Sequence, residues 1–264
     1  LDLRATTIGQ AVAQNEAIIT HTGREKPFGY IDWWPTSMWF NHADGPFTSK
    51  EVRWAVSYSI NRQQMLDVAL EGSGTLTELP FPRYAPLEPF FAPAADLLTK
   101  YPTTEFNLEK AAALMEGQGY EKDGEGFWVK DGERITFQII TFPQHPSTTP
   151  QAPIVTEQLR QAGFDASFLL PADFVTRIQT GEAVAFLWGH GGSMRDPYAT
   201  LERLYHIKHV LPTGEAIPFT NLYRWENQEF SDIVDQMTGV AEDDPKLKEL
   251  FRQAMEIWLP NLPD

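Results

Sequence analysis

The stretch from residue 188 to residue 198 gathers residue types that bind small molecules. A tryptophan ends an apolar run, and the glycines after it allow the backbone to approach a ligand. The stretch reads Trp188-Gly189-His190-Gly191-Gly192-Ser193-Met194-Arg195-Asp196-Pro197-Tyr198. We predict ligand contacts from Trp188, His190, Gly191, Ser193, Arg195 and Tyr198. The alternative is a structural loop whose tryptophan only packs in the core.

A second aromatic surface is expected at Trp33 and Trp34. Adjacent residues of a strand face opposite sides, so at most one of the two rings lines a cleft. His145 lies in a loop that follows another expected strand, and we add it to the predicted site. Aromatic platforms suit sugar rings, whose CH faces are apolar, and they also suit peptide side chains.

Catalytic and metal-binding motifs are missing from the sequence. There is no GxSxG, HExxH, Walker A or GxGxxG pattern, and there is no cysteine. Asp243 and Asp244 precede Pro245 and are expected to cap a helix rather than to catalyse. His206 and His209 lack an evident third ligand, so solvated surface side chains are expected there. We therefore expect no enzyme activity, no metal and no cofactor.

The segment from 135 to 188 alternates strands and helices, which predicts an α/β fold with a mixed, mostly parallel sheet flanked by helices. Ligands bind outside the carboxyl ends of the strands in such sheets. This rule selects the loops 143–153 and 189–197. The expected strands and helices of this unit are 135–142, 152–161, 164–170, 173–179 and 183–188.

Further helices are expected on both sides of this unit. Apolar residues at three- and four-residue spacing predict one amphipathic helix over 49–70, with Thr48 or Ser49 as its cap. Six prolines predict an extended course for 75–106. The C-terminal part is expected to form helices over 227–237 and 245–258.

The composition excludes some partners. The chain has 264 residues and a formal net charge of −15. Such a charge disfavours nucleic acid and anionic membranes, because phosphates attract clusters of Lys and Arg. The chain has no run of about 18 apolar residues. Aromatic residues make up 12% of the chain, with 8 tryptophans, three of which are Trp33, Trp34 and Trp39.

An ordered set of motifs resembles a known family. The set comprises Phe40-Asn41, Pro46-Phe47, Val52-Arg53-Trp54-Ala55 and Ser59-Ile60-Asn61-Arg62, then Asn107-Leu108-Glu109-Lys110-Ala111, Gly119-Tyr120 and Gln158-Leu159-Arg160-Gln161-Ala162-Gly163-Phe164. This order resembles the family 5 extracellular solute-binding proteins, which are the oligopeptide-, dipeptide- and sugar-binding components of ABC importers. The resemblance spans nearly the whole chain.

The resemblance implies a type II periplasmic-binding-protein architecture, in which two lobes close on a ligand and no chemistry is performed. Residues 1–264 are expected to be the C-terminal lobe, with the N-terminal lobe absent from this chain. The protein is expected outside the cytoplasm, in the periplasm or as a membrane-anchored lipoprotein, with its signal sequence outside this fragment. The expected partners are a small ligand and the cognate ABC permease, and the expected state is a monomer.

The ligand class follows from one departure from the family pattern. Peptide-binding members usually place an Asp, which pairs with the α-amino group of the peptide, a few residues before an Asp-Pro pair. Here the residues before Asp196-Pro197 are Gly191, Gly192, Ser193, Met194 and Arg195. The resemblance therefore favours an oligosaccharide, such as a gluco- or manno-oligosaccharide, with an oligopeptide or dipeptide as the alternative. A glycoside hydrolase with two facing carboxylates, and a protein-interaction module, are further alternatives.

Overall fold

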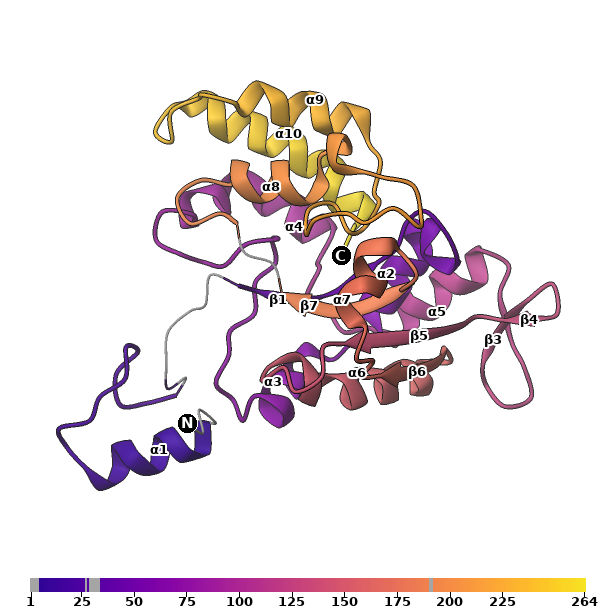
Figure 1. Cartoon of the computed structure of the whole chain (residues 1–264), viewed down its shortest axis with the longest axis horizontal. Coiled ribbons are helices and arrows are strands. Elements are labelled where there is room, and N and C mark those ends of the chain that lie inside the picture. Colours follow the sequence, from indigo (N-terminus) through magenta and orange to yellow (C-terminus); the bar gives the residue numbers. More distant parts are fainter. Residues whose placement is uncertain (1–4, 27, 29–33, 190–191) are drawn as a thin grey trace.

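A four-stranded sheet lies at the centre of the computed structural model, which describes residues 5–26, 28, 34–189 and 192–264. Its strands follow the order β1 (Thr36–Phe40), β7 (Ala185–Gly189), β5 (Thr136–Thr141) and β6 (Asp165–Leu169). β5 runs parallel to both β6 and β7, whereas β1 pairs antiparallel with β7 (Figure 1). The mixed, mostly parallel sheet predicted from the sequence is confirmed, and β1 is the strand that the prediction omitted.

Alternation along the strands divides the hydrophobic core between the two faces of the sheet. In β1, Met38 and Phe40 enter one cluster and Trp39 enters the other. In β7, Phe186 joins the cluster of Trp39, while Leu187 joins the cluster of Met38. This is the period of two expected for a sheet that is covered on both faces.

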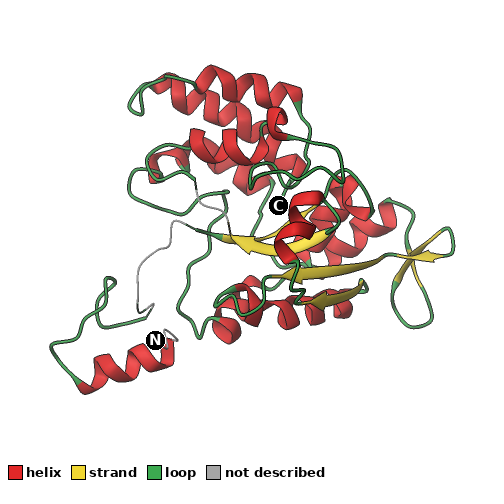
Figure 2. Ribbon diagram, in the orientation of Figure 1, coloured by secondary structure: helices red, strands yellow, loops and turns green. Residues whose placement is uncertain are grey.

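Helices lie on both sides of the central strands (Figure 2). The helices that pack in the cluster of Met38 are α2 (Lys50–Tyr58), α3 (Arg62–Ala69), α5 (Leu108–Gly117) and α6 (Thr148–Ala162). The prediction of one helix over 49–70 was wrong, because α2 ends at Tyr58 and Asn61 caps a new helix. The Ser49 cap is confirmed, since its side chain accepts from the Val52 amide. α6 begins four residues earlier than predicted.

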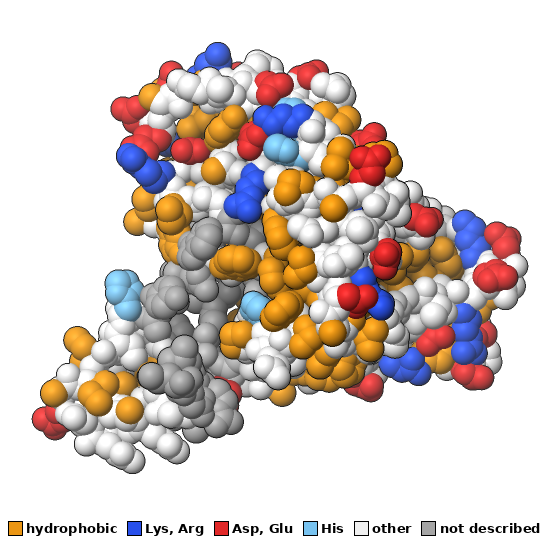
Figure 3. Space-filling model, viewed as in Figure 1, with side chains coloured by type: hydrophobic (Ala, Val, Ile, Leu, Met, Phe, Trp, Pro, Cys, Tyr) orange, Lys and Arg blue, Asp and Glu red, His pale blue; other side chains and the backbone are white. Residues whose placement is uncertain are grey.

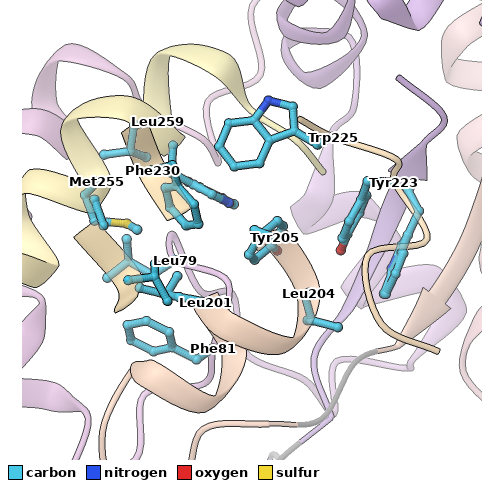
Figure 4. Close-up of a cluster of buried hydrophobic side chains, with 14 of the residues drawn as sticks. Leu79, Phe81, Leu201, Leu204, Tyr205, Tyr223, Trp225, Phe230, Met255 and Leu259 are labelled. Carbon is cyan, nitrogen blue, oxygen red and sulfur yellow. The ribbon is translucent and has the colours of Figure 1, made fainter. Parts of the chain in front are cut away.

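The other face carries the C-terminal helices. They are α7 (Phe174–Thr180), α8 (Tyr198–Tyr205), α9 (Gln228–Met237) and α10 (Pro245–Asn261), together with α4 (Ala95–Lys100). Tyr205 and Tyr223 lie side by side in their core (Figure 4), with ring centroids 5.2 Å apart. Trp39 stacks on Tyr223 at 4.2 Å and so joins this core to the sheet.

The remaining elements are peripheral. Helix α1 (Ala5–Gln14) lies apart from the sheet in Figure 1. Short strands β2 (Glu121–Lys122), β3 (Trp128–Lys130) and β4 (Glu133–Arg134) form a separate small sheet. The four 3-10 turns are Pro46–Thr48, Glu88–Phe90, Ala92–Ala94 and Ile207–His209. The extended course predicted for 75–106 was therefore wrong in its second half, which contains two of these turns and α4. None of the helices in the described part of the chain combines the length and the apolar character needed to cross a membrane.

Arg53 and Asn41, two residues of the family motifs, are buried and link separate elements by hydrogen bonds. The Arg53 guanidinium donates to the carbonyls of Phe47 at 2.6 Å, Asn261 at 2.6 Å and Leu262 at 3.0 Å, and so ties α2 to the end of α10. Asn41 Nδ2 donates to the Gly181 carbonyl at 2.8 Å and ties the end of β1 to the turn before β7. These side chains position the elements around the sheet.

Candidate functional site

Five aromatic rings meet where β5 and β7 end. Trp188 lies at the centre, with ring-centroid distances of 5.2 Å to Phe174, 5.6 Å to His145, 5.9 Å to Trp34 and 6.2 Å to Phe142. We call these five residues the aromatic cluster. Trp188 is only partly buried. The cluster therefore offers ring faces and edges at the sheet edge where α/β proteins bind ligands.

The topology explains why these rings meet. β5 and β7 are parallel neighbours, so Phe142, directly after β5, and Trp188, near the end of β7, lie at the same edge of the sheet. β1 runs the opposite way, and its first residue, Thr36, pairs with Gly189. Trp34 therefore reaches the same edge from the start of β1. The antiparallel edge strand is what joins the two aromatic surfaces that the sequence presented separately.

More apolar side chains are exposed at this edge. Phe142 is 40% exposed, and Leu169 and Leu170 at the end of β6 are 39% and 40% exposed. On the face drawn in Figure 3, hydrophobic side chains gather in the middle of the molecule, whereas charged ones lie mainly towards its outer parts.

His145 supplies a polar group to the cluster. Its Nδ1 accepts from the Thr148 amide at 3.3 Å and lies 3.1 Å from Ser147 Oγ. Burial lowers the pKa of His145, so the ring is neutral at neutral pH. Because Nδ1 is an acceptor, the proton resides on Nε2, which remains a donor for a ligand.

The predicted contact Ser193 is turned inward. Ser193 is 2% exposed, and its hydroxyl accepts from the Thr200 amide at 3.0 Å. In return, the Ser193 amide donates to Thr200 Oγ1 at 2.9 Å. This reciprocal pair fixes the loop to the first turn of α8. The geometry gives Ser193 a loop-holding role, and the sequence offered no sign of its burial.

Arg195 and Tyr198 lie outside the aromatic cluster. The Arg195 side chain is 74% exposed and forms an ion pair with Glu242 at 2.7 Å. The Tyr198 hydroxyl accepts from Thr238 Oγ1 at 3.2 Å, and its ring packs on the core of the C-terminal helices. Both side chains are thus engaged with α9 and the turn after it. Three further predicted residues, Trp33, His190 and Gly191, lie outside the described residues.

The histidine pair is organised differently from the prediction. His206 is buried, with Nε2 3.1 Å from Asp235 Oδ1, while His209 Nε2 lies 3.2 Å from Glu202 Oε1. The expectation of two solvated side chains was wrong for His206, which is 5% exposed because it packs beside Asp235 of α9. Within the described ranges, no group of three His, Cys, Asp or Glu side chains could hold a metal ion.

The Asp244 cap of α10 is confirmed, since its carboxylate accepts from the Lys246 amide at 2.9 Å.

Phe142, Phe174 and a cavity beside β1 were not predicted from the sequence. Phe142 directly follows β5 and Phe174 begins α7, so both looked like ordinary core residues; their positions beside strand ends were the available signal. The cavity has a volume of about 240 Å³ and is lined by β1, the α2–α3 region and the C-terminal residues. None of the five rings of the aromatic cluster lines it.

Comparisons with known proteins place the chain among binding proteins. The family model described as bacterial extracellular solute-binding proteins, family 5 Middle, matches residues 6–210. Heme-binding protein A of Haemophilus influenzae is 24% identical over 84% of this chain and 38% of its own length. The dipeptide-binding protein of Pseudomonas aeruginosa is 24% identical over 85% of this chain and 38% of its own length.

The fold is also similar to a solved structure, that of a periplasmic oligopeptide-binding protein from Thermotoga maritima with bound mannohexaose. The TM-score is 0.82 at 19% identity, over 96% of this chain and 47% of that chain. This likeness confirms the expected type II periplasmic-binding-protein fold. The chain spans less than half the length of each of these three proteins.

Proposed function

The chain belongs to the family 5 bacterial extracellular solute-binding proteins, and from this premise we propose that it is one lobe of the solute-capturing component of an ABC importer. It acts outside the cytoplasm, binds its ligand without chemical change and delivers it as a monomer to the cognate permease. The observation that carries the proposal is the aromatic cluster at the carboxyl ends of β5 and β7. A partner lobe would close over this edge.

A short peptide is the ligand that we propose first. The dipeptide-binding relative matches across 85% of this chain, and aromatic rings with a neutral histidine donor suit apolar side chains and amide groups. The loop before Asp196 has glycine and serine at 191–193, so a carboxylate partner for a peptide amine is not supplied there. We infer that the backbone and side chains of the peptide, rather than its amino terminus, dominate its contacts with this lobe.

An oligosaccharide is the second candidate, and two observations favour it. The similar fold from Thermotoga maritima holds mannohexaose, and that likeness covers 96% of this chain. The pair of Trp34 and Trp188 at 5.9 Å also offers the kind of ring surface on which sugar CH faces stack. The expectation of a sugar ligand from the sequence thus stays a candidate, behind the peptide.

Hydrolysis of a sugar is not part of the proposal. A glycoside hydrolase places two carboxyl groups about 5–10 Å apart across the bond that it cleaves. Trp188 makes its ring contacts with the other members of the aromatic cluster, and the carboxylate that follows the loop, Asp196, accepts from the Tyr198 amide at 2.9 Å. Members of this family are binding proteins, in agreement with the prediction of no enzyme activity.

Calorimetric titration tests the proposed ligand class. The chain is titrated with mixed di- and tripeptides and, separately, with mannohexaose and cellohexaose. We expect heat from peptides, and an affinity loss of about 10- to 100-fold in Trp188→Ala, because one aromatic contact contributes roughly 1–3 kcal/mol. Arg134→Met, whose ion pairs with Asp123 and Glu125 lie at the separate small sheet of β2 to β4, is the matched control and should bind like the unmodified chain. Binding heat from the hexasaccharides and none from the peptides would show that the ligand is an oligosaccharide and not a peptide.

A further inference from the structure

Trp34 lies directly on the backbone of Gly189. A β-carbon placed on residue 189 would lie 1.6 Å from Trp34 Nε1 and 1.7 Å from Trp34 Cδ1. No side chain larger than hydrogen fits there while the indole stays in place. The same indole makes an edge contact with Trp188, with an interplanar angle of 78°. Gly189 therefore leaves the space that the Trp34 ring occupies when it contacts the Trp188 ring.

Backbone conformation does not explain this glycine. Gly189 is the last residue of β7 and pairs with Thr36, and it is not among the glycines with positive φ. Any amino acid could adopt its extended conformation, and glycine is disfavoured within strands. What requires a glycine is the ring packed on it. This requirement distinguishes Gly189 from Gly163 and Gly181, where φ is 104° and 78°.

We propose that Gly189 is a positioning residue for ligand recognition, because it seats Trp34 beside Trp188 and so sets the spacing of the two rings that a ligand meets. The ligand part of this proposal rests on the proposed function. The seating also couples the start of β1 to the loop after β7, which are 155 positions apart in the chain. A β-carbon at residue 189 displaces the indole and leaves Trp188 without its edge partner.

A double-mutant cycle tests the seating. The variants are Gly189→Ala, Trp34→Ala and the double variant, with Gly117→Ala as a control, since a β-carbon at 117 meets nothing within 4 Å. The first readout is the nuclear Overhauser contact between the indole protons of Trp34 and Trp188. The second is the affinity for a tripeptide and for mannohexaose. Urea unfolding of all four variants shows which of them are folded.

We expect Gly189→Ala to abolish the contact between the two indoles and to lower affinity at least 10-fold, with Gly117→Ala unchanged. In the Trp34→Ala background there is no ring to displace, so adding Gly189→Ala should change affinity less than 2-fold. The cycle also separates displacement of the Trp34 ring from a general weakening of β7 by alanine. A general weakening would lower affinity equally in both backgrounds.

Two results would overturn the proposal: an intact indole contact in Gly189→Ala, or the same loss in both backgrounds. Failure of the proposed function looks different. In that case neither probe binds the unmodified chain, while the indole contact still disappears in Gly189→Ala and persists in Gly117→Ala. The interaction between residues 34 and 189 can then be measured from stability instead of affinity. Gly189→Ala should lower the midpoint of urea unfolding in the unmodified chain but not in the Trp34→Ala background.

Discussion

At the scale of single residues, backbone carbonyls hold two cations, the buried Arg53 and the half-buried Arg62. Arg53 donates to carbonyls at the end of α10, and Arg62 donates to the Ser57 carbonyl at 3.0 Å and to Ser57 Oγ at 2.8 Å. Burial lowers the pKa of each guanidinium to about 10, so both stay charged at neutral pH. The negative end of a helix dipole suits a cation in this position.

Replacement of Arg53 should therefore destabilise the lobe strongly. Arg53→Met leaves the carbonyls of Phe47, Asn261 and Leu262 without their donor, and we expect a loss of about 2–4 kcal/mol in the free energy of unfolding. Urea denaturation measures this loss. Arg177→Met removes an exposed pair with Asp173 and should cost less than about 1 kcal/mol. Equal losses in the two variants would contradict a structural role for the buried cation.

His42 makes the stability of the lobe depend on pH. Its Nε2 lies 3.0 Å from the Pro263 carbonyl and donates to it. Burial and, to a lesser degree, the nearby Arg53 lower the pKa of His42 to about 3. The unfolded chain binds this proton near pH 6.5 and the folded chain does not, so stability is full above pH 6.5 and falls as the pH drops towards 3.

Between pH 6.5 and pH 5.0, this group should remove about 2 kcal/mol of stability, at about 1.4 kcal/mol per pH unit. His42→Gln keeps a donor for the Pro263 carbonyl but has no titration, so its acid loss should be smaller by that amount. Urea unfolding at the two pH values gives the difference. Parallel losses in the variant and the unmodified chain would show that another group carries the dependence.

At the scale of elements, the break between α2 and α3 is set by one side chain. Asn61 Oδ1 accepts from the Gln64 amide at 3.0 Å, and Gln158 of α6 bonds to the Asn61 backbone. The cap starts α3 in a new direction, and Gln158 ties the junction to α6. The apolar spacing continues across the break, which is why the sequence pattern predicted a single helix.

Asn61→Ala should cost about 1 kcal/mol because the helix start loses its cap, and Asn61→Asp should retain most of the stability. Midpoints of urea unfolding for the two variants provide the comparison. If alanine and aspartate at this position were equally destabilising, the cap would not be what defines the break.

The sequence predicted elements whose signals are local. β5, β6 and β7 match the strands expected over 135–142, 164–170 and 183–188, and α9 and α10 match the helices expected over 227–237 and 245–258. β1 was missed because its five residues form a strand by pairing with β7, which lies about 150 positions later in the chain. The aromatic cluster divides in the same way: Trp34, His145 and Trp188 were among the predicted site residues, whereas Phe142 and Phe174 were not. The burial of Ser193 depends on Thr200 and α8, which a linear pattern does not reveal.

At the scale of the whole molecule, two cores pack on opposite faces of one sheet, and the aromatic cluster lies between them at the carboxyl ends of β5 and β7. The C-terminal helices and the α2–α6 layer occupy the faces, and β1 closes one side of the sheet. The strand ends between these layers hold the aromatic cluster, whose rings come from four separate segments of the chain. A scaffold that fixes rings from distant segments is suited to recognise a ligand without catalysis.

If the carboxyl ends of β5 and β7 bind the ligand, the indole signals of a ¹H–¹⁵N spectrum report the binding. The chain carries 8 tryptophans, and single substitutions assign Trp34 and Trp188. On addition of a tripeptide, we expect shifts at Trp34 and Trp188 that saturate together, with the buried Trp39, Trp128 and Trp258 unchanged. Saturable shifts at other indoles, with Trp34 and Trp188 unmoved, would show that the ligand binds elsewhere.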